Sequence, residues 1–446
     1  MAAHPDDVKR ETPDSLRDQL IRAFTKTRSV SDQMAAGLSP EDQNLQSMPD
    51  ASPIKWHRAH TTWFFETFVL KPLSEEGIQP YGSPNDQFAY LFNSYYNGVG
   101  AQFPRAQRSL MSRPDTQEVD EYRAAVDGAM HSLLANASED VLNRLTDRVV
   151  LGLNHEQQHQ ELMVTDLKHA FSFNPIAPAW TKRPDLIGHP TPQAWVPFTG
   201  GLKETGHRPE DDVNRLSFHF DNEGPIHKVH LNDYALARRP VTCGEYINVI
   251  NDGGYENAHL WLSDGWAWRR DQQITAPLYW RLEEGQWYLH TLGCWREVDP
   301  EEPICHISFY EATAFALWAG ARLPTEHEWE NAARVQMGAH VVGHFADSQR
   351  FHPSRALEDE VSDLSQLIKM YGDVWEWTAS SYAPYPGFKP VAGAIGEYNG
   401  KFMANQVVLK GGSCATPAGH VRPSYRNFFY PPDRWQFTGL RLAKDL

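Results

Sequence analysis

Apolar and polar positions follow a helical period over roughly the first third of the chain. Segments 15–24, 61–70 and 139–153 place apolar residues three and four positions apart and contain few glycines. Such spacing lines one face of each helix with apolar side chains, and those faces can pack against one another. The pattern therefore predicts a helical bundle over residues 12–171.

The pattern changes after the bundle. Residues 172–200 are rich in proline and aperiodic, which predicts an ordered linker. Residues 201–446 carry glycine, tryptophan and short β-rich runs such as HKVHLNDYALARRPVT and QVVLKGGS, with few long helical patterns. This composition is typical of an irregular α+β domain held by turns and aromatic packing. We therefore expect an α domain followed by an α+β domain, since 446 residues are long for one core.

Charge and cysteine content narrow the class of protein. The chain has 41 basic and 57 acidic residues, a net charge of −16, which argues against a nucleic-acid or acidic-membrane partner. No apolar run approaches roughly 18 residues, and the opening MAAHPDDVKRETPD does not resemble a secretory leader. The four cysteines are too few and too scattered for a disulfide framework or a structural zinc site. We expect a cytoplasmic protein without a membrane partner; the sequence leaves its oligomeric state open.

Candidate chemistry begins with a pair of histidines in LNHEQQHQELMVTDL, residues 153–167. His155 and His159 are one helical turn apart, so both imidazoles can reach one metal ion. With 20 histidines in the chain, roughly one H-x-x-x-H pair is expected by chance. A second pair, His340 and His344, lies among glycines and valines, and we expect it in a loop or strand.

A third metal ligand has to come from another helix of the bundle. The segment PIKWHRAHTTWFFETF offers His57 and His60, of which His60 better continues the apolar face. The alternative is that His60 is a core histidine hydrogen-bonded to a carbonyl group. Imidazole ligates iron, zinc, copper or nickel, and a site with open positions can do chemistry on a substrate.

Longer motifs carry a family resemblance. The WHRAH and HEQQHQE segments resemble the three-histidine iron site of DinB-like helical domains. Residues 321–334, 371–388 and 408–443 look like signature blocks of the formylglycine-generating-enzyme fold, a sulfatase-modifying-factor, C-type-lectin-like domain. The order of the two domains is similar to that of the nonheme-iron sulfoxide synthases of ergothioneine biosynthesis (EgtB family).

The resemblance implies an Fe(II) enzyme with His60, His155 and His159 as metal ligands. Enzymes of this family use O2 to join a thiol to C2 of the imidazole of hercynine, and they oxidise the product to a sulfoxide. Three neutral imidazoles would leave three positions on iron for the reactants. Glu161 is about 200° round the helix from His159, so we expect a supporting role for it and not ligation.

Substrate contacts follow from the same resemblance. Gln158 and Asn427 match an amide pair that hydrogen-bonds the substrate imidazole, and both side chains can donate and accept. Phe428 and Tyr398 match aromatic residues that would face the trimethylammonium group of hercynine. The alternatives are a solvated helix residue for Gln158 and core packing for the aromatic residues.

Two departures from the best-known branch bear on the thiol. Phe429 stands where enzymes that use γ-glutamylcysteine carry an aspartate, and Ile395 stands where they carry a catalytic tyrosine. Both losses fit a subgroup that uses cysteine and takes its tyrosine from the helical domain. Tyr95 and Tyr96 are the candidates to replace the missing catalytic tyrosine. A phenol in the active site can donate a proton and favour C–S bond formation over thiol dioxygenation.

Two arginines follow these tyrosines. Arg105 or Arg108 could bind the carboxylate of the thiol substrate through both arms of its guanidinium group. The alternative is that both are ordinary surface residues.

Other functions remain open from the sequence. An ovothiol-type sulfoxide synthase or a thiol dioxygenase would use similar ligands, although no G-x-G-x-x-G motif supports the methyltransferase domain usual in the former. A non-catalytic ligand-binding module is a different class that uses the same fold. A formylglycine-generating oxidase needs a cysteine pair, and only Cys414 lies in the GGSC block.

Overall fold

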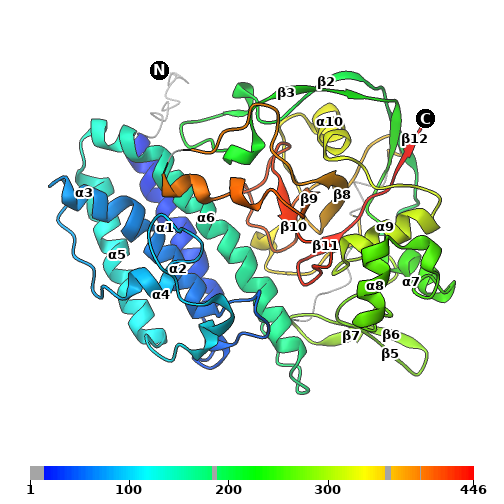
Figure 1. Ribbon diagram of the computed structural model, residues 1–446, viewed down its shortest axis with the longest axis horizontal. Helices are drawn as coiled ribbons and strands as arrows, with labels where there is room; N and C mark the ends of the chain where they lie inside the picture. Colours follow the sequence, from blue (N-terminus) through cyan, green and yellow to red (C-terminus); the bar gives the residue numbers. More distant parts are fainter. Residues whose placement is uncertain (1–14, 183–187, 357–362, 392) are drawn as a thin grey trace, which may run out of the picture.

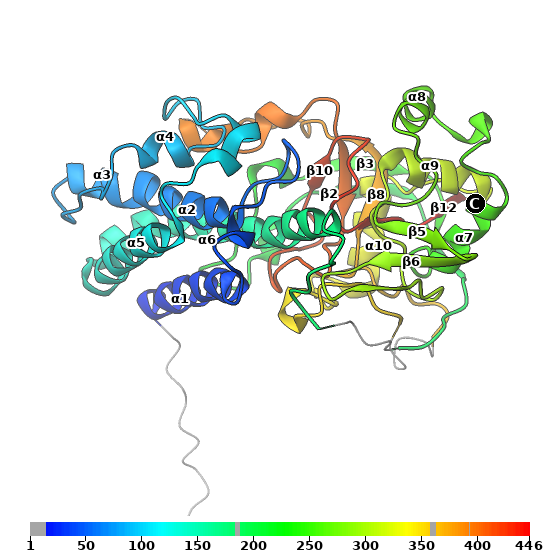
Figure 2. The same cartoon turned by 90° about the horizontal axis from the view of Figure 1, so that it is seen from below.

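A helical lobe and a mixed lobe lie side by side, and the longest helix runs along the boundary between them (Figures 1 and 2). The computed structural model describes residues 15–182, 188–356, 363–391 and 393–446. Part of the predicted linker, residues 183–187, lies outside the described residues. The expected order of an α domain and an α+β domain is confirmed.

Helices make up the N-terminal lobe. They are α1 (Leu16–Ala35), α2 (Ile54–Phe65), a π-helical turn (Glu66–Leu70), α3 (Lys71–Glu75), α4 (Phe88–Phe92), α5 (Thr116–Asn136) and α6 (Glu139–Ser172), with 3-10 turns at Asp42–Asn44 and Arg105–Leu110. Ser15, Asp115 and Ser138 cap α1, α5 and α6 by accepting backbone N–H groups. The predicted helical segments are therefore confirmed, because periodicity and capping residues agree.

Helix α2 is the centre of the bundle. All twelve of its residues are buried, and it packs against α5 and α6. Gly152 permits a close approach of α6, because a Cβ atom there would lie 2.7 Å from Phe65 Cε1 and 2.9 Å from Phe64 Cε1. This crossing places polar residues of α2 beside the α6 residues that follow Gly152.

Short strands and helices build the C-terminal lobe. The strands are β1 (Trp195–Phe198), β2 (Gly201–Thr205), β3 (His227–Leu231), β4 (Tyr234–Ala237), β5 (Trp280–Glu283), β6 (Gln286–His290), β7 (Trp295–Glu297), β8 (Trp375–Ser381), β9 (Val407–Lys410), β10 (Asn427–Phe429), β11 (Thr438–Gly439) and β12 (Ala443–Asp445). The helices are α7 (Cys243–Asn251), α8 (Ser263–Asp271), α9 (Phe309–Trp318) and α10 (Glu326–Met337), with 3-10 turns between them. The strand orders are β10-β9-β8-β11, β1-β4-β12, β5-β6-β7 and β2-β3. The expected irregular α+β character is confirmed.

Helix α6 joins the two lobes. Its Glu161 carboxylate accepts hydrogen bonds from Trp375 Nε1 (2.8 Å), Ser413 Oγ (2.5 Å) and Thr416 Oγ1 (2.7 Å). The expected supporting role of Glu161 is thus a buried contact between the lobes. One helix carries two of the predicted ligands and also holds the C-terminal lobe in place.

The second histidine pair lies where the sequence predicts. His340 is in a loop, and His344 forms an isolated bridge with Gly372 and contacts Asp373 Oδ1 at 3.0 Å. Within the described ranges, no helix is both long and apolar enough to cross a membrane.

Candidate metal centre and active site

Three buried histidines meet where α2 crosses α6. His60 comes from α2, and His155 and His159 come from adjacent turns of α6. The ring centroids are 4.8 Å apart for His60 and His155, 4.7 Å for His60 and His159, and 4.6 Å for His155 and His159. The structure thus brings together the three side chains that the sequence nominates as ligands.

Hydrogen bonds at the outer nitrogens set the orientation of two rings. His60 Nδ1 donates to the carbonyl oxygen of Phe92 at 2.5 Å, so its Nε2 is left with a lone pair. His57 Nε2 donates to Asp166 Oδ2 at 3.1 Å, so His57 Nδ1 can accept from His159 Nδ1 at 2.8 Å. His159 Nε2 is therefore unprotonated as well, and Asp166 and His57 hold the ring as partners of metal ligands commonly do.

The electrostatics favour neutral imidazoles. Burial lowers the pKa of His155 to about 3, and it lowers the pKa of His60 and His159 well below the ordinary value. Metal ligation requires the neutral form. His60 Nε2 and His155 Nε2 lie 3.1 Å apart. Two ligand nitrogens bound at right angles, each about 2.1 Å from one ion, would be about 3 Å apart, so the residues fit a mononuclear metal ion.

A stack of aromatic rings supports His60. Trp56 and Trp63 cover its two faces at 4.6 Å and 5.6 Å. The Arg108 guanidinium lies 3.3 Å from the Trp56 ring centre, donates to Ser52 Oγ at 2.8 Å, and has its pKa lowered to about 9 by burial. Arg105 is exposed, and its guanidinium donates to the backbone oxygen of Asp50. The two candidate arginines therefore differ, and only Arg108 is buried close to the histidines.

Gln158 links the helical lobe to two tyrosines of the C-terminal lobe. Its Nε2 donates to Tyr425 OH at 2.8 Å, and its Oε1 accepts from Tyr398 OH. The Tyr398 ring is 5.7 Å from His155 and 6.1 Å from Tyr95. Residues more than two hundred positions apart in the chain thus form one wall beside the histidines.

Tyr95 and Tyr96 stack at 4.7 Å but face different surroundings. Tyr96 is fully buried and packs against Trp63 at 5.7 Å and Phe68 at 5.1 Å, inside the bundle. Tyr95 faces Tyr398 instead, and burial raises the pKa of its phenol above the ordinary value, so it stays protonated. Only Tyr95 lies against the wall formed by Gln158 and Tyr398.

The three candidates on β10 lie further out. Phe428 stacks on Tyr382 at 4.0 Å and reaches Phe402 at 6.2 Å, and Phe402 is 5.4 Å from Tyr95. Asn427 Oδ1 accepts from the backbone N–H of Phe428 at 2.9 Å. The ring of Phe429 packs against Trp435 at 6.1 Å. The structure therefore connects β10 to the tyrosine wall through Phe402.

Sequence reasoning missed Tyr425 and Phe402 of this wall, and it preferred His60 to His57 as a ligand. Tyr425, two positions before Asn427, holds Gln158, and Phe402 lies between Tyr95 and Phe428. His57 belongs to the same WHRAH segment as His60 but contacts a ligand from outside. The only sequence signal for Tyr425 is its place inside the 408–443 block.

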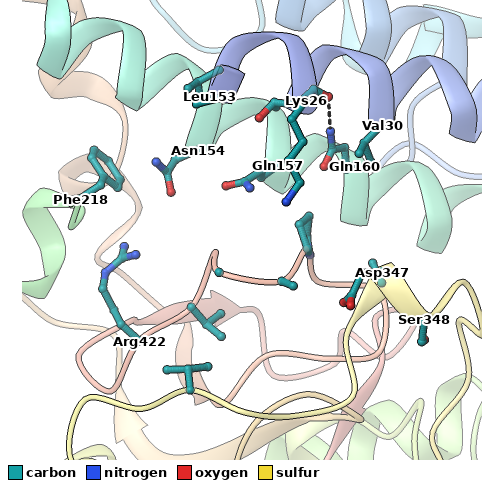
Figure 3. Close-up of a pocket in the computed structure, with 18 of the residues that line it drawn as sticks. Lys26, Val30, Leu153, Asn154, Gln157, Gln160, Phe218, Asp347, Ser348 and Arg422 are labelled. Atoms are coloured by element: carbon teal, nitrogen blue, oxygen red, sulfur yellow. Dashed lines mark hydrogen bonds between the residues drawn. The ribbon is translucent and has the colours of Figure 1, made fainter. Parts of the chain in front are cut away.

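A cleft of about 1240 Å³ opens on another face of α6. Leu153, Asn154 and Gln157 border it from α6, and Phe218 and Arg422 border it from the C-terminal lobe (Figure 3). The three histidines do not line this cleft. The candidate metal centre is therefore separate from it.

A helical lobe that brings three histidines together and a mixed lobe packed against it are the features of a class, the two-domain nonheme metalloenzymes. Residues 23–163 match the DinB superfamily, and residues 189–446 match the sulfatase-modifying factor enzyme 1-like domain. The chain belongs to the hercynine oxygenase (EgtB) family. Hercynine oxygenase of Mycolicibacterium thermoresistibile is 31% identical over 97% of this chain and 95% of that protein.

Two further relatives extend over the same length. The hercynine oxygenases of Mycolicibacterium smegmatis and Mycobacterium tuberculosis are 30% and 31% identical, over 98% of this chain and 100% of each protein. The similarity therefore includes both lobes.

Proposed function

We propose that the protein joins a thiol to C2 of the hercynine imidazole with O2 and returns the sulfoxide. In the balanced reaction the C2–H and S–H hydrogens leave as water with one oxygen atom, and the other oxygen atom stays on sulfur. The observation that carries the proposal is the convergence of His60, His155 and His159 in a member of the hercynine oxygenase family. We assign the metal centre to the predicted helical domain, residues 12–171, and its cover to the predicted second domain, residues 201–446, which the strand β1 (Trp195–Phe198) extends into the predicted linker 172–200.

His60, His155 and His159 would hold Fe(II), which supplies O2 activation and a binding position for the thiolate when it is bound. Side chains around the centre would bind the substrates and donate a proton. Gln158, held between Tyr398 and Tyr425, offers one donor and one acceptor to a neutral imidazole beside the centre. Asn427 is the second amide proposed for the same substrate.

Tyr95 is the proton donor that we propose, with Tyr96 supporting its ring. Two observations favour Tyr95: its ring faces Tyr398, and its phenol is protonated at neutral pH. Tyr96 packs against Trp63 and Phe68. A donor beside the reacting sulfur favours C–S bond formation over dioxygenation of the thiol.

The remaining contacts concern the charged ends of the substrates. Tyr398 and Phe428 offer aromatic faces to the trimethylammonium group, which has no hydrogen to donate. Arg108 is the better candidate for the carboxylate of the thiol, because it is buried near the histidines while Arg105 is exposed. Phe429 cannot pair with the ammonium group of γ-glutamylcysteine, so we propose cysteine as the thiol.

The test combines metal analysis with product analysis. In anaerobic Fe(II) titration, His60→Ala, His155→Ala and His159→Ala should each bind one equivalent less than the parent, whereas His340→Ala and His344→Ala should bind as many equivalents as the parent. Full iron occupancy in His155→Ala would contradict the metal centre.

Products are then identified by mass and NMR after aerobic turnover of the iron-loaded parent with hercynine and either thiol. Attachment at C2 with a preference for cysteine supports the proposal. Attachment at another ring carbon indicates an ovothiol-type enzyme, and cysteine sulfinate alone indicates a thiol dioxygenase. A preference for γ-glutamylcysteine would reverse the assignment of the thiol.

A further inference from the structure

A second cluster of metal-binding side chains lies in the C-terminal lobe, away from the three histidines. His207, Asp212 and His219 offer one ligand atom each, and these atoms lie within 4.8 Å of one another. The three residues belong to the loop that connects β2 to the 3-10 turn Asp221–Glu223. His207 and Asp212 also line the cleft on α6.

His207 has the environment of a ligand without its ion. Its side chain is 8% exposed, and neither ring nitrogen makes a hydrogen bond among the described residues, although Nδ1 lies 4.0 Å from Asp211 Oδ2. Buried ring nitrogens that make no hydrogen bond are costly and call for an explanation. Nε2 of His207 nevertheless lies 3.2 Å from Asp212 Oδ1. Two atoms that bind one ion at about 2.1 Å are separated by about 3.0–3.4 Å, so this contact has the spacing of two ligands.

His219 completes the set from the other end of the loop. Its ring stacks on His207 with centroids 3.8 Å apart and planes at 12°. In this stack the lone pairs of the rings do not converge on one point, so His219 has to turn to ligate. The side chain is exposed, so this rotation costs little.

The neighbouring carboxylate of Asp211 is already engaged. It accepts hydrogen bonds from Arg334 Nη1 and Nη2 at 3.1 and 3.0 Å. These bonds fix the loop to α10, so Asp212 remains as the carboxylate available for a ligand.

We propose that His207, Asp212 and His219 form a second metal site, which takes a divalent transition-metal ion of the zinc class. Two imidazoles and one carboxylate suit Zn²⁺, Co²⁺ or Ni²⁺, whereas Ca²⁺ and Mg²⁺ prefer oxygen ligands throughout. A water molecule would complete a tetrahedral set.

The ion would close the loop that these residues delimit. His207 stands at the beginning of this loop and His219 at its end. The binding free energy of one ion would therefore offset the entropy cost of holding the two ends together. The next residue, Phe220, stacks on Tyr398 at 5.4 Å with planes at 11°. Binding would therefore also hold Phe220 against the tyrosine that bonds Gln158. Any effect on turnover rests on the proposed function, but the binding of the ion does not.

Equilibrium dialysis against Zn²⁺ and Co²⁺, with metal counted by mass spectrometry, tests the site. The parent should bind two ions per chain, His155→Ala one, and the double variant His207→Ala/His219→Ala one. Asp212→Asn should weaken the second ion about tenfold or more, since even outer partners of a metal site contribute 10–100-fold. Co²⁺ bound to His155→Ala should show absorption bands of a tetrahedral ion.

The matched control is His227→Ala/His327→Ala, which removes another histidine pair of the same lobe, with rings 5.8 Å apart. This variant should still bind two ions. The proposal is overturned if the parent saturates with one ion or if the double variant still binds two. Should the double variant lose its circular dichroism, Asp212→Asn decides, because its exposed side chain can be exchanged without loss of packing, and an unchanged second affinity overturns the proposal.

The outcome is independent of the hercynine assay. If the double variant loses the second ion but still makes sulfoxide, the second site is separate from the reaction. If the parent binds both ions but is inactive on hercynine, the metal site stands and the proposed function fails.

Discussion

At the scale of single residues, a hydrogen bond at the nitrogen that faces away from the proposed metal position orients two of the three imidazoles. The Phe92 carbonyl fixes His60, and the Asp166–His57 pair fixes His159, so each presents Nε2 inward. The same rule applies to Gln158, whose amide is oriented by Tyr398 and Tyr425. The chemistry at this scale depends on which N–H hydrogen or lone pair of each group is left without a protein partner.

Replacement of Tyr95 by Phe tests the proton donor. Tyr95→Phe keeps the ring and its packing but removes the hydroxyl, so folding and iron binding should persist. We expect sulfoxide synthesis to fall by about 10²–10⁴-fold, the usual contribution of general acid catalysis, with more cysteine sulfinate per turnover. Both products are quantified by mass spectrometry. Tyr96→Phe is the matched control and should change the ratio little.

A large effect in Tyr96→Phe with none in Tyr95→Phe would exchange the two roles. If neither variant differs from the parent, the donor lies elsewhere, and Tyr398 is the next candidate.

At the scale of elements, the crossing of α2 and α6 sets the distance between the ligands. Gly152 is one turn before His155 on α6 and lies against Phe64 and Phe65 of α2. His60 and His155, two of the proposed ligands, thus lie within one or two turns of this tight contact. A change that separates the helices should weaken metal binding even though it touches no ligand.

Gly152→Ala tests this separation. The added methyl group meets Phe65 Cε1 at 2.7 Å, and such overpacking costs roughly 1–3 kcal/mol, more than the gain of up to about 1 kcal/mol in helix propensity. We expect a lower melting temperature and a weaker Fe(II) affinity. Gly128→Ala on α5 is the matched control, because nothing lies within 4 Å of its added methyl group. It should leave stability equal or higher, and a similar loss in both variants would contradict the argument.

Glu156 connects three helices, and its pKa predicts that the stability of the fold depends on pH. Its carboxylate accepts from Arg28 Nη1 and Arg123 Nη2 at 2.8 Å each and from Ser31 Oγ at 2.6 Å. Burial alone would raise the pKa of Glu156, but the two arginines outweigh it and lower this pKa from 4.5 to about 2. Because the folded pKa is depressed, the ionised group stabilises the fold above pH 4.5, and this contribution is lost as the pH falls toward 2.

Glu156→Gln should therefore cost roughly 3 kcal/mol at pH 7, since it removes the carboxylate shared by two buried arginines. The change leaves Arg28 with Asp127 alone and Arg123 with Asp32 alone. The difference in the free energy of unfolding between Glu156→Gln and the parent should shrink as the pH falls from 4.5 to the lowest pH at which both proteins remain folded. Denaturant midpoints measured over this range test the prediction. Parallel curves for both proteins would refute the assigned pKa.

At the scale of the whole molecule, the proposed active site is built from residues of both lobes. The proposed metal ligands come from α2 and α6, whereas Tyr398 and Tyr425 come from the C-terminal lobe. Glu161 holds the lobes together at the back of α6 through Trp375, Ser413 and Thr416. Docking and catalysis should therefore be lost together.

Glu161→Ala tests the coupling of the lobes. It leaves three buried donors without an acceptor, which should cost at least about 2 kcal/mol. We expect scanning calorimetry to resolve two transitions where the parent shows one, and sulfoxide synthesis to fall while iron binding to the three histidines persists. Glu139→Ala, which removes an exposed carboxylate of the same helix, is the control. A single unshifted transition in Glu161→Ala would show that the docking depends on other contacts.

Local periodicity predicts much of this protein. Spacings of three and four residues identify the bundle helices, and the single-turn spacing of His155 and His159 places both on one face, because a helix repeats every 3.6 residues. Short β-rich runs between glycines predict the irregular second lobe. These features depend on residues close in sequence, so the sequence alone determined them.

Tertiary structure decided the rest. Gln158 bonds Tyr398 and Tyr425 across 240 and 267 residues, and Glu161 bonds Trp375 across 214. Tyr95 and Tyr96 are neighbours of the same type, and only the packing of the lobes gives them different surroundings. No periodic pattern records such pairs, because the two partners share neither a helix nor a strand. Burial in the docked molecule brings them together and sets their pKa values.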